Sequence, residues 1–135
     1  MVSFGGQIAS KNLDSSEKYS LGGYSSIRAY DMSVISGDQG YKLTTEYRKS
    51  VVQELISGSL QAVVFYDIGR LQVMKNTITS DENFATLSGI GAGMNWAVAQ
   101  GFSSSLSIAV PTGNLPSLLT SRDSYRVWFQ LQKTF

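Results

Sequence analysis

The sequence predicts an all-β protein, an antiparallel meander of six strands of the kind that builds transmembrane barrels. Six stretches alternate between apolar and polar residues with period two, and the connections between them alternate between long and short. Each stretch is roughly ten residues long, close to the ~9–11 that a tilted strand needs to cross a bilayer and longer than the ~5–6 of an average soluble strand. A soluble antiparallel sandwich is the alternative, because a single barrel strand carries a weak signal.

The alternation is cleanest at residues 102–110, where large apolar side chains lie opposite small ones, and it is weakest in the first two stretches. Faces rich in glycine and serine offer little apolar area for a packed soluble core, so they suit the wall of a polar lumen. The expected strands span residues 2–11, 41–51, 61–69, 88–98, 102–110 and 125–132. The side chains expected to face lipid are those of Leu106, Ile108, Val110, Val127, Phe129 and Leu131.

The connections follow the rhythm of an outer-membrane barrel, in which short periplasmic turns alternate with longer external loops. The long connections are expected at residues 13–39, 75–86 and 112–123, and the short ones at 54–58 and 100–101. This rhythm puts the first long connection on the external side and the end of the chain at the periplasmic rim.

Composition excludes several classes of function. The 11 basic and 10 acidic residues leave no charge excess for a nucleic-acid partner. The chain has no cysteine and no histidine, so zinc, thiol and Ser-His-Asp chemistry lack their usual groups, and we predict no catalytic residue, no metal and no cofactor. No apolar run reaches the ~18–20 residues of a membrane helix, and the first residues do not read as a signal peptide.

One arginine and one aspartate occupy unusual positions. Arg28 lies in a glycine-rich loop, and Asp67 lies in the alternating stretch 61–69. We expect a buried ion pair that fixes the long loop against the barrel wall, since a guanidinium and a carboxylate pair bidentately. The alternatives are a solvated loop arginine and a lumen-facing aspartate without a special partner.

Two further patterns concern the inward face. Glu46 and Arg48 lie two residues apart and therefore share the luminal face, where they would pair with a neighbouring strand or line the pore. Gly89, Gly91 and Gly93 repeat at period two and remove side chains from one wall. Glycine in a strand marks a close approach by another group, and the inward-folded loop is the natural occupant.

Several short motifs occur in the order and spacing of a known family. The chain resembles the two-partner secretion transporters, haemolysin secretion/activation-type members of the Omp85 superfamily. The resemblance rests on Gly6-Gln7-Ile8-Ala9, Leu21-Gly22-Gly23, Ile27-Arg28-Ala29-Tyr30, Gly37-Asp38-Gln39-Gly40-Tyr41, Glu46-Tyr47-Arg48, Val64-Phe65-Tyr66-Asp67-Ile68-Gly69-Arg70, Leu87-Ser88-Gly89-Ile90-Gly91-Ala92-Gly93 and Tyr125-Arg126-Val127-Trp128-Phe129-Gln130-Leu131.

The resemblance implies that residues 1–135 are the C-terminal part of a sixteen-stranded transmembrane β-barrel, with residues 13–40 folding into the lumen and no POTRA domain present. It implies an outer-membrane pore that exports a large haemolysin- or adhesin-type partner protein, the partner binding through POTRA domains elsewhere in the parent. Outer-membrane lipid and the barrel assembly machinery are the other partners implied. We expect the chain to be a fragment, because six strands leave two open edges. An Omp85-type barrel that assists insertion of outer-membrane proteins is the alternative, whereas a lipase-like enzyme is disfavoured by the absence of histidine.

The resemblance also assigns residues to the loop lock. Arg28 and Asp67 correspond to the family's paired arginine and aspartate. The loop motif comprises Gly22, Gly23, Ile27, Ala29 and Tyr30, and the strand motif includes Phe65 and Gly69. Ala29 stands where the family usually has glycine, so backbone strain of about 1 kcal/mol or more is expected if that position has positive φ.

The end of the chain resembles the C-terminal signal that outer-membrane proteins present to the assembly machinery. Lys133 interrupts the alternation where an apolar residue is usual, and a plain edge strand is the alternative. The signal would comprise Tyr125, Val127, Phe129, Leu131 and Phe135.

Overall fold

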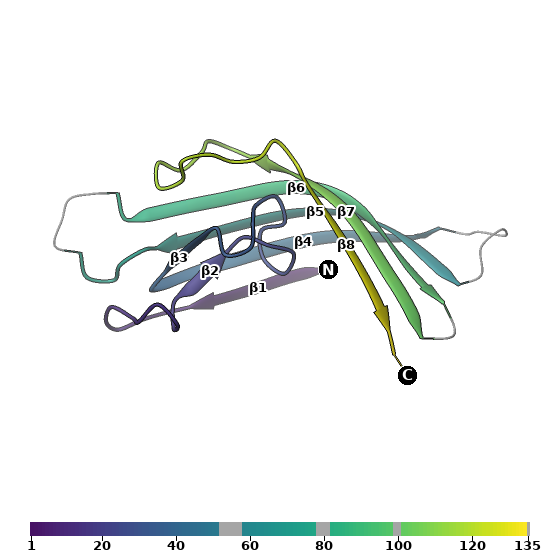
Figure 1. Ribbon diagram of the computed structural model, residues 1–135, viewed down its shortest axis with the longest axis horizontal. Coiled ribbons are helices and arrows are strands. Elements are labelled where there is room, and N and C mark those ends of the chain that lie inside the picture. The colour runs from purple at the N-terminus through teal and green to yellow at the C-terminus, as the bar shows by residue number, and fades with distance from the viewer. Residues whose placement is uncertain (52–57, 78–81, 99–100, 135) are drawn as a thin grey trace.

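The computed structural model describes residues 1–51, 58–77, 82–98 and 101–134. These residues form an open six-stranded antiparallel sheet of order β1-β4-β5-β6-β7-β8, together with a separate two-stranded sheet β2-β3 (Figure 1). The predicted all-β architecture with six antiparallel strands is confirmed. The strands of the large sheet are β1 (Val2–Gln7), β4 (Gln39–Val51), β5 (Ser59–Gln72), β6 (Phe84–Val98), β7 (Phe102–Thr112) and β8 (Arg126–Lys133). In the described part of the chain, no helix is both long and apolar enough to cross a membrane.

The central strands extend further than the alternation predicted. β4, β5 and β6 contain 13, 14 and 15 residues. β6 begins at Phe84, inside the connection expected at 75–86, because its first residues continue the ladder up to the pair formed by Phe84 and Gln72. In contrast, β1 ends at Gln7 and not at Lys11, since Gln7 is the last residue that pairs with β4.

The long connection between β1 and β4 contains a small hairpin that the sequence did not predict. β2 (Tyr19–Leu21) pairs with β3 (Ile35–Gly37) in an antiparallel register. Strands of three residues are too short to leave an alternating pattern, which explains why the segment read as a loop. The hairpin folds back over one face of the large sheet, in front of β4 (Figure 1).

The register gives the sheet two different faces. Directly paired residues share a face, so the ladder running through Tyr47, Val64, Ala92, Ile108 and Val127 crosses five strands on one side. We call this the outward face, and its large apolar side chains are exposed. Exposed residues on it include Tyr47, Val64, Tyr66, Ile90, Met94, Leu106, Ile108, Val110, Val127, Phe129 and Leu131.

The opposite, inward face carries the core, and the β1–β4 connection supplies four of the ten described residues of its main cluster. Leu21, Ile27, Ala29 and Tyr30 come from the connection and are almost fully buried. They pack against side chains of the strands in one cluster. The strand residues of this cluster are Val63, Phe65, Leu71, Ala85, Leu87 and Ala109. Among the described residues, the hydrophobic core therefore forms where the connection covers the sheet.

Asp38 anchors the base of the connection. Its carboxylate accepts hydrogen bonds from the backbone N–H groups of Leu13 at 3.2 Å and Lys75 at 2.7 Å, and the Lys18 ammonium lies 3.3 Å away. The side chain is completely buried. Burial raises the pKa of the Asp38 carboxyl, but the two backbone hydrogen bonds and Lys18 outweigh it and hold that pKa below its usual value.

The depressed pKa of Asp38 predicts acid sensitivity at the base of the connection. The stabilisation is fully present above the unfolded pKa of about 3.9 and is lost as the pH falls through the lower folded pKa. We expect hydrogen-exchange protection of the Leu13 and Lys75 amides to fall on acidification to about pH 3. Asp38→Asn should remove most of this dependence, whereas Asp14→Asn, at an exposed acid of the same segment, should leave it intact. An unchanged pH dependence in Asp38→Asn would contradict the assignment.

Candidate functional site

The turn at residues 22–31 presents its side chains to the inward face. Gly22 and Gly23 have φ of 101° and 100°, in the region that favours glycine. A Cβ on Gly22 would lie 2.1 Å from the carbonyl oxygen of Asp31, so no larger residue fits there. Backbone hydrogen bonds from Gly23 N to Tyr30 O and from Tyr30 N to Ile27 O close the turn. These bonds hold Arg28 at the tip of the turn.

Arg28 pairs bidentately with Asp67. Its Nε lies 2.9 Å from Asp67 Oδ2, and its Nη2 lies 2.9 Å from Asp67 Oδ1. The backbone N–H of Arg28 also donates to Oδ2 at 3.2 Å. Two parallel side-chain bonds and a backbone bond fix both the distance and the direction of the loop. The structure thus brings together the two residues that were singled out in the sequence.

Glu46 and Arg48 extend the pair into a chain of four charges. Arg28 Nη1 donates to Glu46 Oε1 at 2.7 Å, and Arg48 donates to Glu46 Oε2 through Nη2 at 2.6 Å and Nε at 2.9 Å. The Arg28 guanidinium also lies over the Phe65 ring, 3.4 Å from its centroid. Glu46 and Phe65 are directly paired in the ladder, so one rung of the sheet provides both contacts. We call Arg28, Asp67, Glu46, Arg48 and Phe65 the lock.

The centre of the lock is buried, Arg48 lies at its exposed edge, and the charges of the cluster balance. Arg28 is 8% exposed, Glu46 8% and Asp67 0%. Burial lowers the pKa of Arg28, but Asp67 and Glu46 outweigh it and raise the pKa above its ordinary value, so the guanidinium stays charged. Two acids face two arginines, which leaves no net charge in the cluster. Removing a single partner would leave an uncompensated buried charge, at a cost of roughly 3–5 kcal/mol.

Glycines in the strands make room for the lock and for its loop. A Cβ on Gly69 would lie 2.9 Å from Leu21 Cδ2, and a Cβ on Gly89 would lie 2.4 Å from Ala29 Cβ. At Gly91 the space is filled by the Phe65 ring, not by the loop. The loop is therefore the occupant above Gly69 and Gly89, whereas Gly91 leaves room for the aromatic ring of Phe65.

Ala29 does not carry the strain that was expected. Among the described non-glycine residues only Ser33 has positive φ, so the Ala29 backbone lies in a region that alanine adopts freely. Its methyl group packs against the bare backbone of Gly89. The close approach of loop and strand requires one residue without a side chain. Gly89 on β6 is that residue, so the loop position can be an alanine.

The last strand also holds the loop, through residues to which the sequence assigned no role. The Trp128 indole N–H donates to the Arg28 carbonyl oxygen at 2.7 Å, and the edge of its ring faces Tyr24. Arg126 pairs with Asp31 at 2.5 Å. A tryptophan on the polar inward face of the last strand was the available signal, because a partly buried indole N–H needs an acceptor. The loop thus bridges β4 and β5 to β8.

The C-terminal residues point away from the lock. Val127, Phe129 and Leu131 alternate outward on β8 and are exposed. Tyr125 lies just before the strand and is also exposed. Phe135 lies outside the described residues.

This arrangement positions a loop and offers no assembled site for a metal ion. Within the described residues, no group of three or more His, Cys, Asp or Glu side chains is placed to hold one. The arginines of the lock are engaged by carboxylates, so they are not presented to a small ligand.

Comparisons with known proteins connect this geometry to a family. Residues 1–96 match the family described as haemolysin secretion/activation protein ShlB/FhaC/HecB. The chain is 31% identical over 137 residues to the heme/hemopexin transporter protein HuxB of Haemophilus influenzae strain 86-028NP. It is 30% identical to another Haemophilus influenzae protein of the same name. Each alignment covers 99% of this chain and 24% of the relative, so the chain spans about a quarter of the length of these relatives. No solved structure gives a significant match.

The contact between Ala29 and Gly89 predicts a reciprocal pair of substitutions. Gly89→Ala should lift the loop from β6, because the two methyl carbons would lie 2.4 Å apart. We expect a loss of roughly 1–3 kcal/mol, as for other overpacked sites, measured by thermal unfolding. Ala29→Gly in the same chain should restore most of that loss. Gly5→Ala is the control, since its nearest neighbour would be a lysine side-chain carbon at 3.8 Å. A destabilised double variant would refute the contact.

Proposed function

The chain belongs to the haemolysin secretion/activation protein family ShlB/FhaC/HecB, and from that premise we propose that it is the C-terminal part of a protein-exporting outer-membrane barrel. Its parent would be a sixteen-stranded pore of a two-partner secretion system. Residues 13–40 would be the loop that folds into the lumen, and transport, not catalysis, would be the activity. The observation that carries the proposal is the lock, because it holds a long loop against the inward face of a sheet whose outward face is apolar.

The two faces suit a wall between lipid and water. Exposed apolar side chains cover the outward face across neighbouring strands. Beyond the loop, a hollow of about 420 Å³ on the inward side is lined mainly by small and amide side chains. Inward-facing residues there are Gln61, Asn95, Ser103, Ser105, Gln130 and Gln132. Apolar-out and polar-in alternation is the pattern of a water-filled transmembrane barrel.

The exported partner would be a large protein of the haemolysin or adhesin type, recognised by POTRA domains of the parent. The relatives are named heme/hemopexin transporter proteins, which supports a partner connected with heme or hemopexin as the second candidate. The exposed C-terminal strand would first be presented to the barrel assembly machinery. Co-expression of the parent with each candidate partner, followed by detection of that partner in the medium, decides between the two.

The membrane placement predicts alternating accessibility along β7. In the full-length parent, single cysteines at Leu106, Ile108 and Val110 should react with a lipid-soluble maleimide. Cysteines at Ser103 and Ser105, which line the hollow on the inward side, should react with a water-soluble one. Uniform aqueous labelling would instead support a soluble sheet. The alternation is expected because successive side chains of a strand point to opposite faces.

The lock predicts a specific defect in export. In the full-length parent, Arg28→Ala and Asp67→Ala should each reduce secretion of the partner while the barrel still reaches the membrane. Arg28→Ala leaves Asp67 buried and unpaired, and Asp67→Ala leaves Arg28 with Glu46 alone, so each change loosens the loop. Arg122→Ala is the matched control, because this loop arginine is exposed and donates to a backbone carbonyl. Secreted partner and heat-modifiable barrel are measured in the same cells.

The double variant separates a shared interaction from two independent ones. Arg28→Ala with Asp67→Ala should export little less than either single variant, since both delete the same contact. Defects that simply add would show that the residues act separately. Loss of the folded barrel in both single variants would assign the pair to assembly instead of export.

A further inference from the structure

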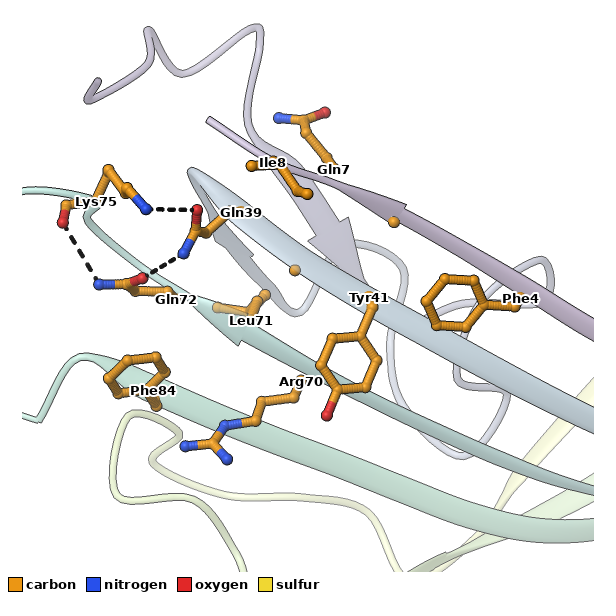
Figure 2. A pocket seen from close by; sticks show the side chains of 12 residues that line it. Phe4, Gln7, Ile8, Gln39, Tyr41, Arg70, Leu71, Gln72, Lys75 and Phe84 are labelled. Atoms are coloured by element: carbon orange, nitrogen blue, oxygen red, sulfur yellow. Dashed lines mark hydrogen bonds between the residues drawn. The ribbon is translucent and has the colours of Figure 1, made fainter. Parts of the chain in front are cut away.

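A groove of about 670 Å³ lies on the outward face, on the opposite side of the sheet from the lock. It is at the end of the sheet where the long connections emerge, and it spans β1, β4, β5 and β6 (Figure 2). The proposed pore does not use it, because it opens away from the inward face. Its side chains fall into an aromatic part and a cationic part. The residues that define it are Phe4, Tyr41, Phe84, Arg70 and Lys75.

Phe4 and Tyr41 form the aromatic part of the groove, near the end of the sheet where the long connections emerge. We call these two rings the aromatic shelf. Phe4 stacks on Tyr41 with ring centroids 6.1 Å apart, and both rings are exposed. Gly6 is the direct ladder partner of Tyr41, so the residue opposite Tyr41 places no side chain beside that ring. Aromatic rings at the end of a lipid-facing strand are typical of the membrane–water interface. The shelf is continuous with the exposed apolar side chains further down the face.

The cationic part has no acidic partner among the described residues. The Arg70 guanidinium lies over the Phe84 ring, 4.9 Å from its centroid, and extends between Phe84 and Tyr41 (Figure 2). The nearby Glu82 accepts a hydrogen bond from Ser117 and forms no ion pair with Arg70. Arg48, in contrast, is neutralised by Glu46. Arg70 is therefore available to an external anion.

Neutral amides complete the polar end of the groove. The Lys75 ammonium donates to Gln39 Oε1 at 3.1 Å, and Gln39 donates in turn to Gln72 Oε1 at 2.7 Å (Figure 2). Lys75 is thus held in place by an amide oxygen that does not cancel its charge. Amides next to cations suit a ligand that carries hydroxyl groups beside a phosphate.

We propose that this groove binds the headgroup of a phosphorylated glycolipid of the leaflet at the loop end, with its acyl chains running down the outward face. Arg70 would pair with the phosphate through its planar fork, and Lys75 would add a second positive charge. Gln39 and Gln72 would meet sugar hydroxyls, while Phe4 and Tyr41 would contact the upper acyl carbons. The inference rests on the proposed function, because it needs the outward face to be in lipid.

The test is lipid retention by the full-length parent. The protein is reconstituted in phosphatidylcholine nanodiscs that contain lipid A, a bis-phosphorylated glycolipid, and retained lipid is counted by native mass spectrometry. Arg70→Gln with Lys75→Gln should lower lipid A retention on the order of tenfold, as expected for lost hydrogen bonds between charged groups. Lys49→Gln is the matched control, since this exposed lysine lies on the same face near the other end of β4. Phe84→Ala, which removes the ring beneath Arg70, should also lower retention.

Three results would overturn the inference. Equal retention by the wild type and the Arg70/Lys75 variant would show that the cations do not bind the headgroup. Equal retention of phosphatidylglycerol or of a phosphate-free glycolipid with the same chains would overturn the assignment to a phosphorylated glycolipid. A dimer abolished by Phe84→Ala would assign the groove to a second copy of the chain. The transporter function is tested separately, since variants that lose lipid A should still insert and export, whereas a wild type that fails to insert would overturn both proposals.

Discussion

The pairing of Arg28 with Asp67 and Glu46 is the constraint on which the inward side of the sheet depends. The register of β4 and β5 places Glu46 and Asp67 on the inward face. Without the guanidinium, Asp67 would be a buried and unpaired carboxylate, and Glu46 would keep only Arg48. Arg28 in turn reaches them only because Gly22 and Gly23 turn the chain and Gly89 lets Ala29 approach β6. The ion pair and the glycine recesses therefore require each other. The ion pair fixes the direction in which the loop points. The glycines of the sheet, which have no side chains, determine how closely the loop approaches the strands.

The same contact explains why an open sheet has a core at all. Six antiparallel strands with an apolar outward face have little left to bury on the inward face, where glycine, serine and amide side chains predominate. Ile27 and Leu21 of the connection supply the missing apolar surface and cover the buried residues of β5 and β6. Asp38 ties the base of the connection and the lock ties its tip, so the segment is held at both ends. We therefore expect the loop to be held rigidly against the inward face of the sheet.

The sequence allowed the strands and the central pair to be predicted, because both leave local signals. Alternation with period two identified the six strands, and an arginine among glycines together with an aspartate in an alternating strand marked Arg28 and Asp67. The contributions of Trp128 and of Arg126, which pairs with Asp31, depend on how far the loop reaches across the sheet, and no pattern within one segment records that distance. The β2–β3 hairpin was missed for a different reason, since three residues per strand are fewer than a period needs. The groove beside Arg70 arises from four strands at once and has no linear signature.

The lock also sets how readily the loop can leave its place. Withdrawing Arg28 would leave Asp67 without its ion-pair partner and Glu46 with Arg48 alone. At roughly 3–5 kcal/mol, this loss reduces the population of a displaced loop by a factor between about 10² and 10⁴. A displaced loop would also forfeit the bond from Trp128 and the ion pair between Asp31 and Arg126, both of which reach the last strand. Movement of the loop and rearrangement of β8 are therefore coupled by direct contacts. Any partner that opens the inward face by moving the loop must provide a compensating cation or admit water to Asp67, because a buried carboxylate is too costly to leave without water or a partner.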